Sequence, residues 1–90
     1  MELTLFNATG PQCTDGTPAG YYLRRASFLS PNKNKWVVWL EGGGICESNA
    51  DCWRRSKGDI GSSSAWPHTH EGTQLLSTDR SANPDFHNCA

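Results

Sequence analysis

The chain has 90 residues and a mass of 9.9 kDa, which allows at most one small domain. A domain of this size buries only about 60–65% of the surface of its unfolded chain, so we expect a marginal apolar core. The net charge of −1 and the charged fraction of 19% give no electrostatic footprint for nucleic acid or an anionic membrane surface, and neither partner is favoured.

The compartment is indicated by the cysteines. Four cysteines in so short a chain favour an oxidising, secretory setting in which disulfides support a thin core. The start MELTLF is too short for a signal peptide, so a targeting segment would have to lie outside this sequence. No apolar run approaches the roughly 20 residues of a membrane span. Asn7-Ala8-Thr9 is an acceptor triplet for N-glycosylation at Asn7, and a plain turn is the alternative.

The first half of the chain reads as short strands joined by turns. Residues 1–12 are expected to be flexible or to start an edge strand, because Leu3-Thr4-Leu5 alternates. Turn-forming residues at 15–20 precede a strand-like run over 21–27. A polar connection over 30–34 then leads into a second strand over 36–40, and the two strands are predicted to form a hairpin.

The central stretch is Trp36-Val37-Val38-Trp39-Leu40, followed by Glu41 and three glycines. This near-continuous apolar run predicts a strand buried on both faces. Gly42, Gly43 and Gly44 leave the backbone bare, so their N–H groups can approach another molecule closely.

A short helix is predicted after the glycines. Ser48 and Asp51 have the S-x-x-D spacing of a capping box, and residues 52–57 can continue the helix with basic residues toward its end. Gly58 or Gly61 would close it. From 58 to 90 we expect long ordered loops with one or two helical turns at most.

Several of these motifs together resemble the N-terminal part of the pectin acetylesterase and Notum family. The matching segments occur in family order, and they are Asp15 to Leu23, Trp36 to Cys46, Cys52, Gly61-Ser62-Ser63, Trp66-Pro67, Leu76-Ser77 and Asn83 to Phe86. The resemblance implies an α/β class, with the chain as the N-terminal fragment of an α/β-hydrolase-like fold. It implies a serine carboxylesterase that removes O-acetyl groups from pectin or, in the Notum branch, a palmitoleoyl group from Wnt proteins. It implies neither a cofactor nor a metal.

The resemblance also assigns the glycine loop. Gly43 and Gly44 are the expected oxyanion-loop positions, with Gly42 shaping the turn, because preorganised N–H donors stabilise the negative oxygen of a tetrahedral intermediate. Ile45 stands where the family has aromatic residues and would change the wall of the acyl pocket. Gly44 favours the acetyl branch. The alternative is a turn that needs glycine for its conformation only.

The cysteines allow three pairings. Cys46 and Cys52 are the predicted pair, because a turn and the first turn of a helix can bring their Cα atoms within the roughly 4.4–6.8 Å that a disulfide requires. By the resemblance, the partner of Cys13 lies beyond residue 90, and a bridge from Cys13 to Cys89 stays an alternative.

Other polar clusters are expected to be structural. His68 and His70 lack the further ligands of a metal site. Ser62, Ser63 and Ser64 do not lie in a G-x-S-x-G nucleophile motif and are interpreted as turn or capping serines. Trp53 and Trp66 could stack on sugar rings, and packing is the preferred interpretation.

The resemblance places the catalytic Ser, Asp and His beyond residue 90, so no catalytic residue is expected in this chain. Residues 1–90 are therefore interpreted as a truncated portion of one α/β-hydrolase-like domain, inactive alone and exposing the apolar edge of residues 36–40. The expected substrate is acetylated pectin or an acylated protein, outside the cell or in the cell wall. A second hypothesis is a complete small secreted module, stapled by disulfides, that binds carbohydrate or protein without catalysis.

Overall fold

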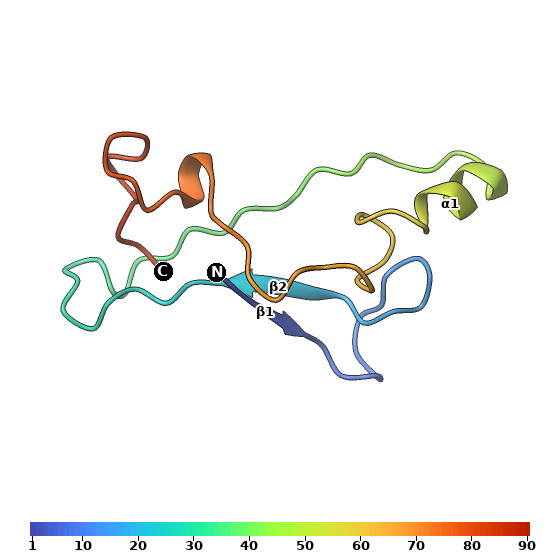
Figure 1. Cartoon of the computed structure of the whole chain (residues 1–90), viewed down its shortest axis with the longest axis horizontal. Coiled ribbons are helices and arrows are strands. Elements are labelled where there is room, and N and C mark those ends of the chain that lie inside the picture. The colour runs from blue at the N-terminus through green and yellow to red at the C-terminus, as the bar shows by residue number, and fades with distance from the viewer. The chain divides into compact units, whose positions relative to one another are not determined.

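The computed structural model describes all residues from Met1 to Ala90. Its elements in chain order are the strands β1 (Glu2–Leu5) and β2 (Gly20–Leu23), the helix α1 (Asn49–Arg55) and the 3-10 turn η1 (Gln74–Leu76) (Figure 1). The remaining residues form turns and loops. The chain is thus a small structure of mixed α and β elements, and none of its helices is long and apolar enough to cross a membrane.

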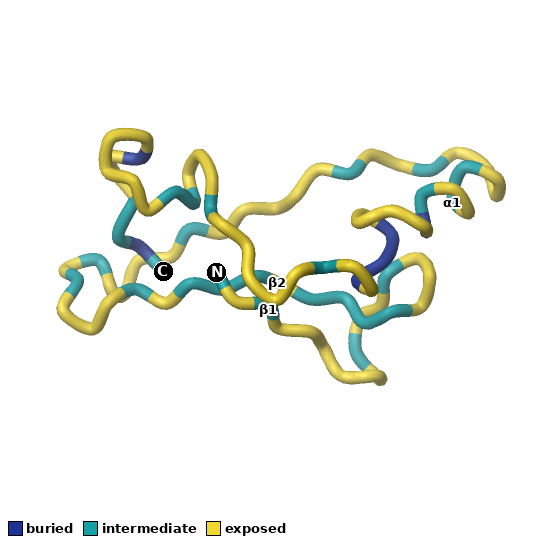
Figure 2. Tube along the Cα trace, viewed as in Figure 1, coloured by how far each residue is buried: buried dark blue, intermediate teal, exposed yellow.

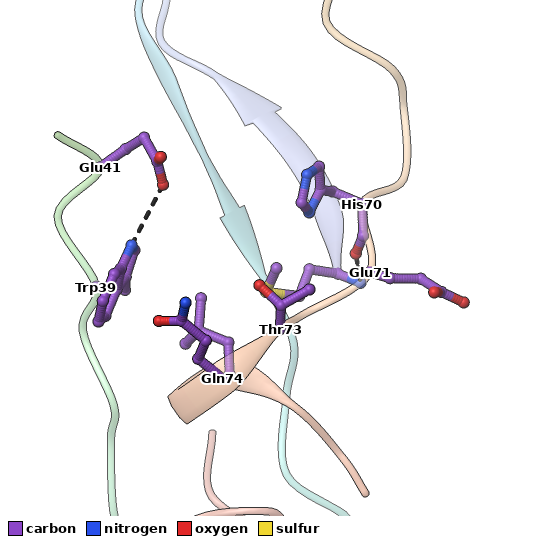
Figure 3. Close-up of a pocket in the computed structure, with 8 residues that line it drawn as sticks. Trp39, Glu41, His70, Glu71, Thr73 and Gln74 are labelled. Carbon is purple, nitrogen blue, oxygen red and sulfur yellow. Dashed lines mark hydrogen bonds between the residues drawn. The ribbon is translucent and has the colours of Figure 1, made fainter. Parts of the chain in front are cut away.

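The only sheet pairs β1 with β2, and the two strands run in opposite directions (Figure 3). The edge strand predicted at Leu3-Thr4-Leu5 is confirmed as part of β1. The strand predicted over 21–27 is shorter, because β2 ends at Leu23. The pairing continues just past the strands, where the Phe6 N–H donates to the Ala19 carbonyl at 2.8 Å.

The strand predicted over 36–40 is absent, so the two-sided burial and the hairpin with residues 21–27 were wrong. Most residues of this segment are exposed (Figure 2). Val38 is exposed to 78% and Leu40 to 85%. Its backbone pairs only with Ala90, whose N–H donates to Lys35 at 3.0 Å and whose carbonyl accepts from Val37 at 2.9 Å. An apolar strand is buried on both faces only where strands and helices flank it, and none does so here.

The chain divides into two compact units. The first comprises Met1–Glu2, Tyr22–Glu41 and Thr69–Ala90. Arg24 connects its segments, donating from Nη1 to the Leu76 carbonyl at 2.9 Å and from Nη2 to the Cys89 carbonyl at 3.3 Å. Asn83 is buried, and its Nδ2 donates to the carbonyls of Leu75 and Ser77 at 2.8 and 3.0 Å. Side-chain to backbone hydrogen bonds therefore hold this unit, and Cys89 is its one buried apolar residue.

The second unit comprises Leu3–Tyr21 and Gly42–His68. Its two segments meet at Asp15 and Thr17: the Asp15 N–H donates to the Gly61 carbonyl at 3.1 Å, and the Ser63 N–H donates to Thr17 Oγ1 at 3.0 Å. Hydrogen bonds from the hydroxyls of Ser62 and Thr17 lower the pKa of Asp15 to about 2. The buried Ser62 and Ser63 thus connect the two segments of the unit.

The loops predicted over 58–90 are present, with η1 as one helical turn.

Candidate functional site

The glycine loop is followed by α1, whose start is the one predicted. Ser48 is the N-cap, and its Oγ accepts from the Asp51 N–H at 3.2 Å. The Asp51 carboxylate does not return to the cap. It pairs instead with Arg54 and with Arg55, whose Nε lies 2.9 Å from Asp51 Oδ2. The helix ends at Arg55 with Ser56 as C-cap, so neither Gly58 nor Gly61 closes it as predicted.

A disulfide joins the loop to this helix. Cys46 and Cys52 are bonded, with their Cα atoms 5.0 Å apart. Cys13 and Cys89 are free, so the alternative bridge between them is absent. A helix of seven residues is too short to be stable in water by its own hydrogen bonds. The Cys46–Cys52 bond therefore supports the helix as well as fixing the end of the loop.

Arg55 makes the second connection between helix and loop. Its Nη1 donates to the Gly43 carbonyl at 2.8 Å while its Nε contacts Asp51. The Arg55 side chain is 37% exposed, whereas that of Arg54 is 75% exposed. Hydrogen bonds from Arg54 and then from Arg55 hold the pKa of Asp51 below its ordinary value, so the carboxylate is ionised near neutral pH.

The three glycine positions differ in backbone conformation and in the space available for a side chain. Gly44 has φ +73°, a backbone conformation that side chains disfavour. At Gly43 an added Cβ would lie 2.7 Å from Ile60 Cγ2, which is too close without a shift. At Gly42 an added Cβ would meet no atom within 4 Å. The structural demand for glycine therefore falls on the two positions assigned to the oxyanion loop.

The N–H groups of Gly42, Gly43 and Gly44 donate no hydrogen bond within the chain. Beside them, the Ile45 side chain is 83% exposed. The loop thus presents unpaired backbone donors next to an apolar side chain. Such donors can stabilise an oxygen on which negative charge develops.

Among the serines over 62–64, Ser62 and Ser64 hydrogen-bond to each other. Ser62 and Ser63 are buried, and Ser62 Oγ lies 2.8 Å from Ser64 Oγ. The exposed Asn7 lies in a turn in which its side-chain Oδ1 accepts from Thr9 Oγ1 at 3.1 Å and its carbonyl accepts from the Gly10 N–H.

A small pocket in the first unit contains none of the site residues predicted from the sequence (Figure 3). Trp39 and Glu41 line one part, with the Trp39 Nε1 donating to Glu41 Oε2 at 3.2 Å, and His70, Thr73 and Gln74 line another. The His70 ring packs against the Tyr22 ring, 5.3 Å between centroids.

Arg55 is the residue that sequence reasoning missed. The sequence placed it only among the basic residues at the helix end. Its spacing of four from Asp51 was an available signal, because acidic and basic side chains at that spacing meet on a helix. Its contact with Gly43, twelve residues earlier, has no counterpart in the sequence pattern.

Comparison with known proteins gives a consistent result. The family model described as Pectinacetylesterase matches residues 1–90. The inactive palmitoleoyl-protein carboxylesterase notum1b of Danio rerio is 40% identical over 98% of this chain and 62% of its own length. The palmitoleoyl-protein carboxylesterase NOTUM of Mus musculus is 38% identical over 98% of this chain. Pectin acetylesterase 4 of Arabidopsis thaliana is 38% identical over 88% of the chain.

The chain spans only part of these relatives. It covers 62% of the Danio rerio protein, 17% of the mouse protein and 19% of the Arabidopsis protein.

Proposed function

Because this chain belongs to the pectinacetylesterase family, we propose that the protein is a carboxylic ester hydrolase that removes O-acetyl groups from pectin. The observation that carries the proposal is the family match over residues 1–90, which includes the glycine loop. The unpaired N–H groups of that loop have the chemistry that ester hydrolysis needs, since the carbonyl oxygen becomes negative in the tetrahedral intermediate.

In the proposed mechanism a serine attacks the ester carbonyl, and the N–H groups of Gly43 and Gly44 stabilise the oxyanion. A preorganised donor of this kind contributes roughly 3–4 kcal/mol to lowering the barrier. Gly42 shapes the turn before them, and Ile45 forms part of the wall around the acyl group. The nucleophile and its partners lie outside residues 1–90, and these residues are one portion of a single α/β-hydrolase-like domain. In isolation they are inactive.

The second candidate is a Notum-like deacylase that removes a palmitoleoyl group from a protein. Relatives named palmitoleoyl-protein carboxylesterase without the word inactive, 36–39% identical to this chain, support it. Gly44 favours the acetyl branch, because the position that it occupies lacks the aromatic side chain of a lipid pocket. Secretion belongs to either proposal, and Asn7 is the proposed glycosylation site because it is exposed and lies in an acceptor triplet.

Enzyme assays test the proposal. The full protein containing residues 1–90 and the isolated chain are expressed through a secretory host and assayed with p-nitrophenyl acetate, acetylated pectin and a palmitoleoylated peptide. We expect the full protein to release acetate from pectin faster than it cleaves the peptide, and the isolated chain to stay at background. Preferred cleavage of the peptide would establish the Notum-like alternative. Binding to pectin without cleavage of any of the three substrates would contradict both esterase proposals and favour a binding module.

A further inference from the structure

The Arg55 guanidinium connects two parts of the second unit, the helix α1 and the glycine loop. Its Nη1 donates to the Gly43 carbonyl at 2.8 Å, and its Nε donates to Asp51 Oδ2 at 2.9 Å. Asp51 lies one turn earlier on α1, and its own N–H is bonded to the Ser48 cap. The arginine is therefore fixed at one end by its own helix and at the other end contacts the loop.

The hydrogen bond from Arg55 to the Gly43 carbonyl also fixes the direction of the Gly44 N–H. The peptide bond between Gly43 and Gly44 is trans and planar, so its C=O and N–H point in opposite directions. Because the carbonyl is directed at Arg55, the Gly44 N–H is directed away from Arg55, and it donates no bond within the chain. The contact thus determines which way one of the two proposed oxyanion donors points.

Without such a contact this peptide would rotate easily. The torsions on either side of it belong to two glycines, whose backbones reach both signs of φ with little steric cost. No other hydrogen bond holds either of its polar groups. Two further contacts restrict the loop, the Cys46–Cys52 bond and the packing of Ile60 beside Gly43, but neither bonds to the carbonyl or the N–H of this peptide.

We propose that Arg55 is a positioning residue of the esterase reaction, which holds the Gly43 carbonyl so that the Gly44 N–H faces the reacting carbonyl oxygen. The proposal rests on the function proposed above. Arg55 does not touch substrate in this role. It acts through the peptide that it holds, and Asp51 acts through Arg55 by fixing the plane of the guanidinium.

Substitutions in the full protein test this role. We expect Arg55→Gln to lower kcat by about 10- to 100-fold with KM changed by less than about twofold, since the donor acts on the transition state more than on bound ester. Affinity for a trifluoromethyl ketone, which forms a tetrahedral oxyanion, should fall by a similar factor. Arg55→Lys should recover part of kcat, because lysine can reach one acceptor but lacks the fork that contacts Asp51 and Gly43 together.

Arg54→Gln is the matched control. Arg54 is the neighbouring arginine, is more exposed and pairs with the same carboxylate, but it does not contact the loop. It should leave kcat within about twofold of the wild-type value. Equal kcat for the wild-type protein and a folded Arg55→Gln variant would overturn the proposal. If Arg55→Gln does not fold, Asp51→Asn decides, with an expected loss of about 3- to 10-fold in kcat, and no loss would overturn the proposal equally.

A readout independent of activity separates the two proposals. In the 15N-labelled chain, Arg55→Gln should shift the Gly44 amide resonance, and Arg54→Gln should leave it in place. If the wild-type protein cleaves no ester but Arg55→Gln still shifts the Gly44 amide resonance, only the proposed function is contradicted. A Gly44 amide that is indifferent to Arg55→Gln contradicts the positioning role, whatever the activity.

Discussion

Two neighbouring stretches of the chain, the apolar segment over 36–40 and the loop and helix over 42–56, behave in opposite ways. In the loop and helix, the Ser48 cap, the Cys46–Cys52 disulfide and the Arg55 contact to Gly43 are all formed. In the apolar segment no strand forms, and Leu40 is 85% exposed. The two stretches were both expected to be central to the structure, so the difference needs a physical explanation.

The explanation is the distance along the chain to each partner. The contacts of the loop and helix join residues 3 to 12 positions apart. The apolar segment pairs only with Ala90, through Lys35 and Val37. A strand buried on both faces needs several distant segments at once, whereas a cap or a short disulfide loop needs only its neighbours. The local contacts of the loop and helix are therefore complete, whereas the apolar segment makes only a small part of the long-range contacts that a buried strand needs.

The largest expected effect concerns the exposed apolar segment. Replacing Val38 and Leu40 with Lys in the isolated chain should weaken self-association by about 100-fold. Each side chain, once buried between copies, contributes at least about 1.5 kcal/mol, and 1.4 kcal/mol is a factor of ten. Sedimentation velocity over a range of protein concentrations measures the change.

Thr14→Lys is the control for added charge, because Thr14 is exposed and lies outside the segment. It should change association far less. If the unsubstituted isolated chain stays monomeric at high concentration, the prediction that the chain self-associates through residues 36–40 is contradicted.

A second prediction tests the loop and helix. Replacing Cys46 and Cys52 with Ser should destabilise α1 by about 2 kcal/mol, which is the loop-closure value for a bridge between residues six positions apart. The Cα chemical shifts of residues 49–55 report the population of the helix. Cys13→Ser is the control, because that thiol is free, and it should leave these shifts unchanged. A helix that persists without the bridge would show that the Ser48 cap and the Asp51 pairs suffice.

Prediction from the sequence succeeded where the signal was local. The alternation at Leu3-Thr4-Leu5 predicted β1, and the spacing of Ser48 and Asp51 predicted the start of α1. The apolar run over 36–40 was misassigned because hydrophobicity indicates only that a segment can be buried. Whether other segments cover it is not encoded in the run itself.

For the candidate site, resemblance identified the glycine loop but could not distinguish its members. Residues 42, 43 and 44 are all glycine, so residue type does not distinguish them. Their surroundings depend on neighbours such as Ile60 and Arg55. Arg55 was missed for the same reason. Its contact with Gly43 depends on how the chain turns between them.

The smallest expected effect is a difference in stability between alanine substitutions at two glycines of the loop. Gly44→Ala should destabilise the full protein by about 1 kcal/mol, because Gly44 has φ +73° and an L side chain is strained there. Gly42→Ala should cost almost nothing, since its φ is not positive and an added Cβ meets no atom within 4 Å. Urea denaturation of both variants measures the difference. Equal losses would mean that the loop rearranges in the full protein and that Arg55 does not hold Gly43 as it does here.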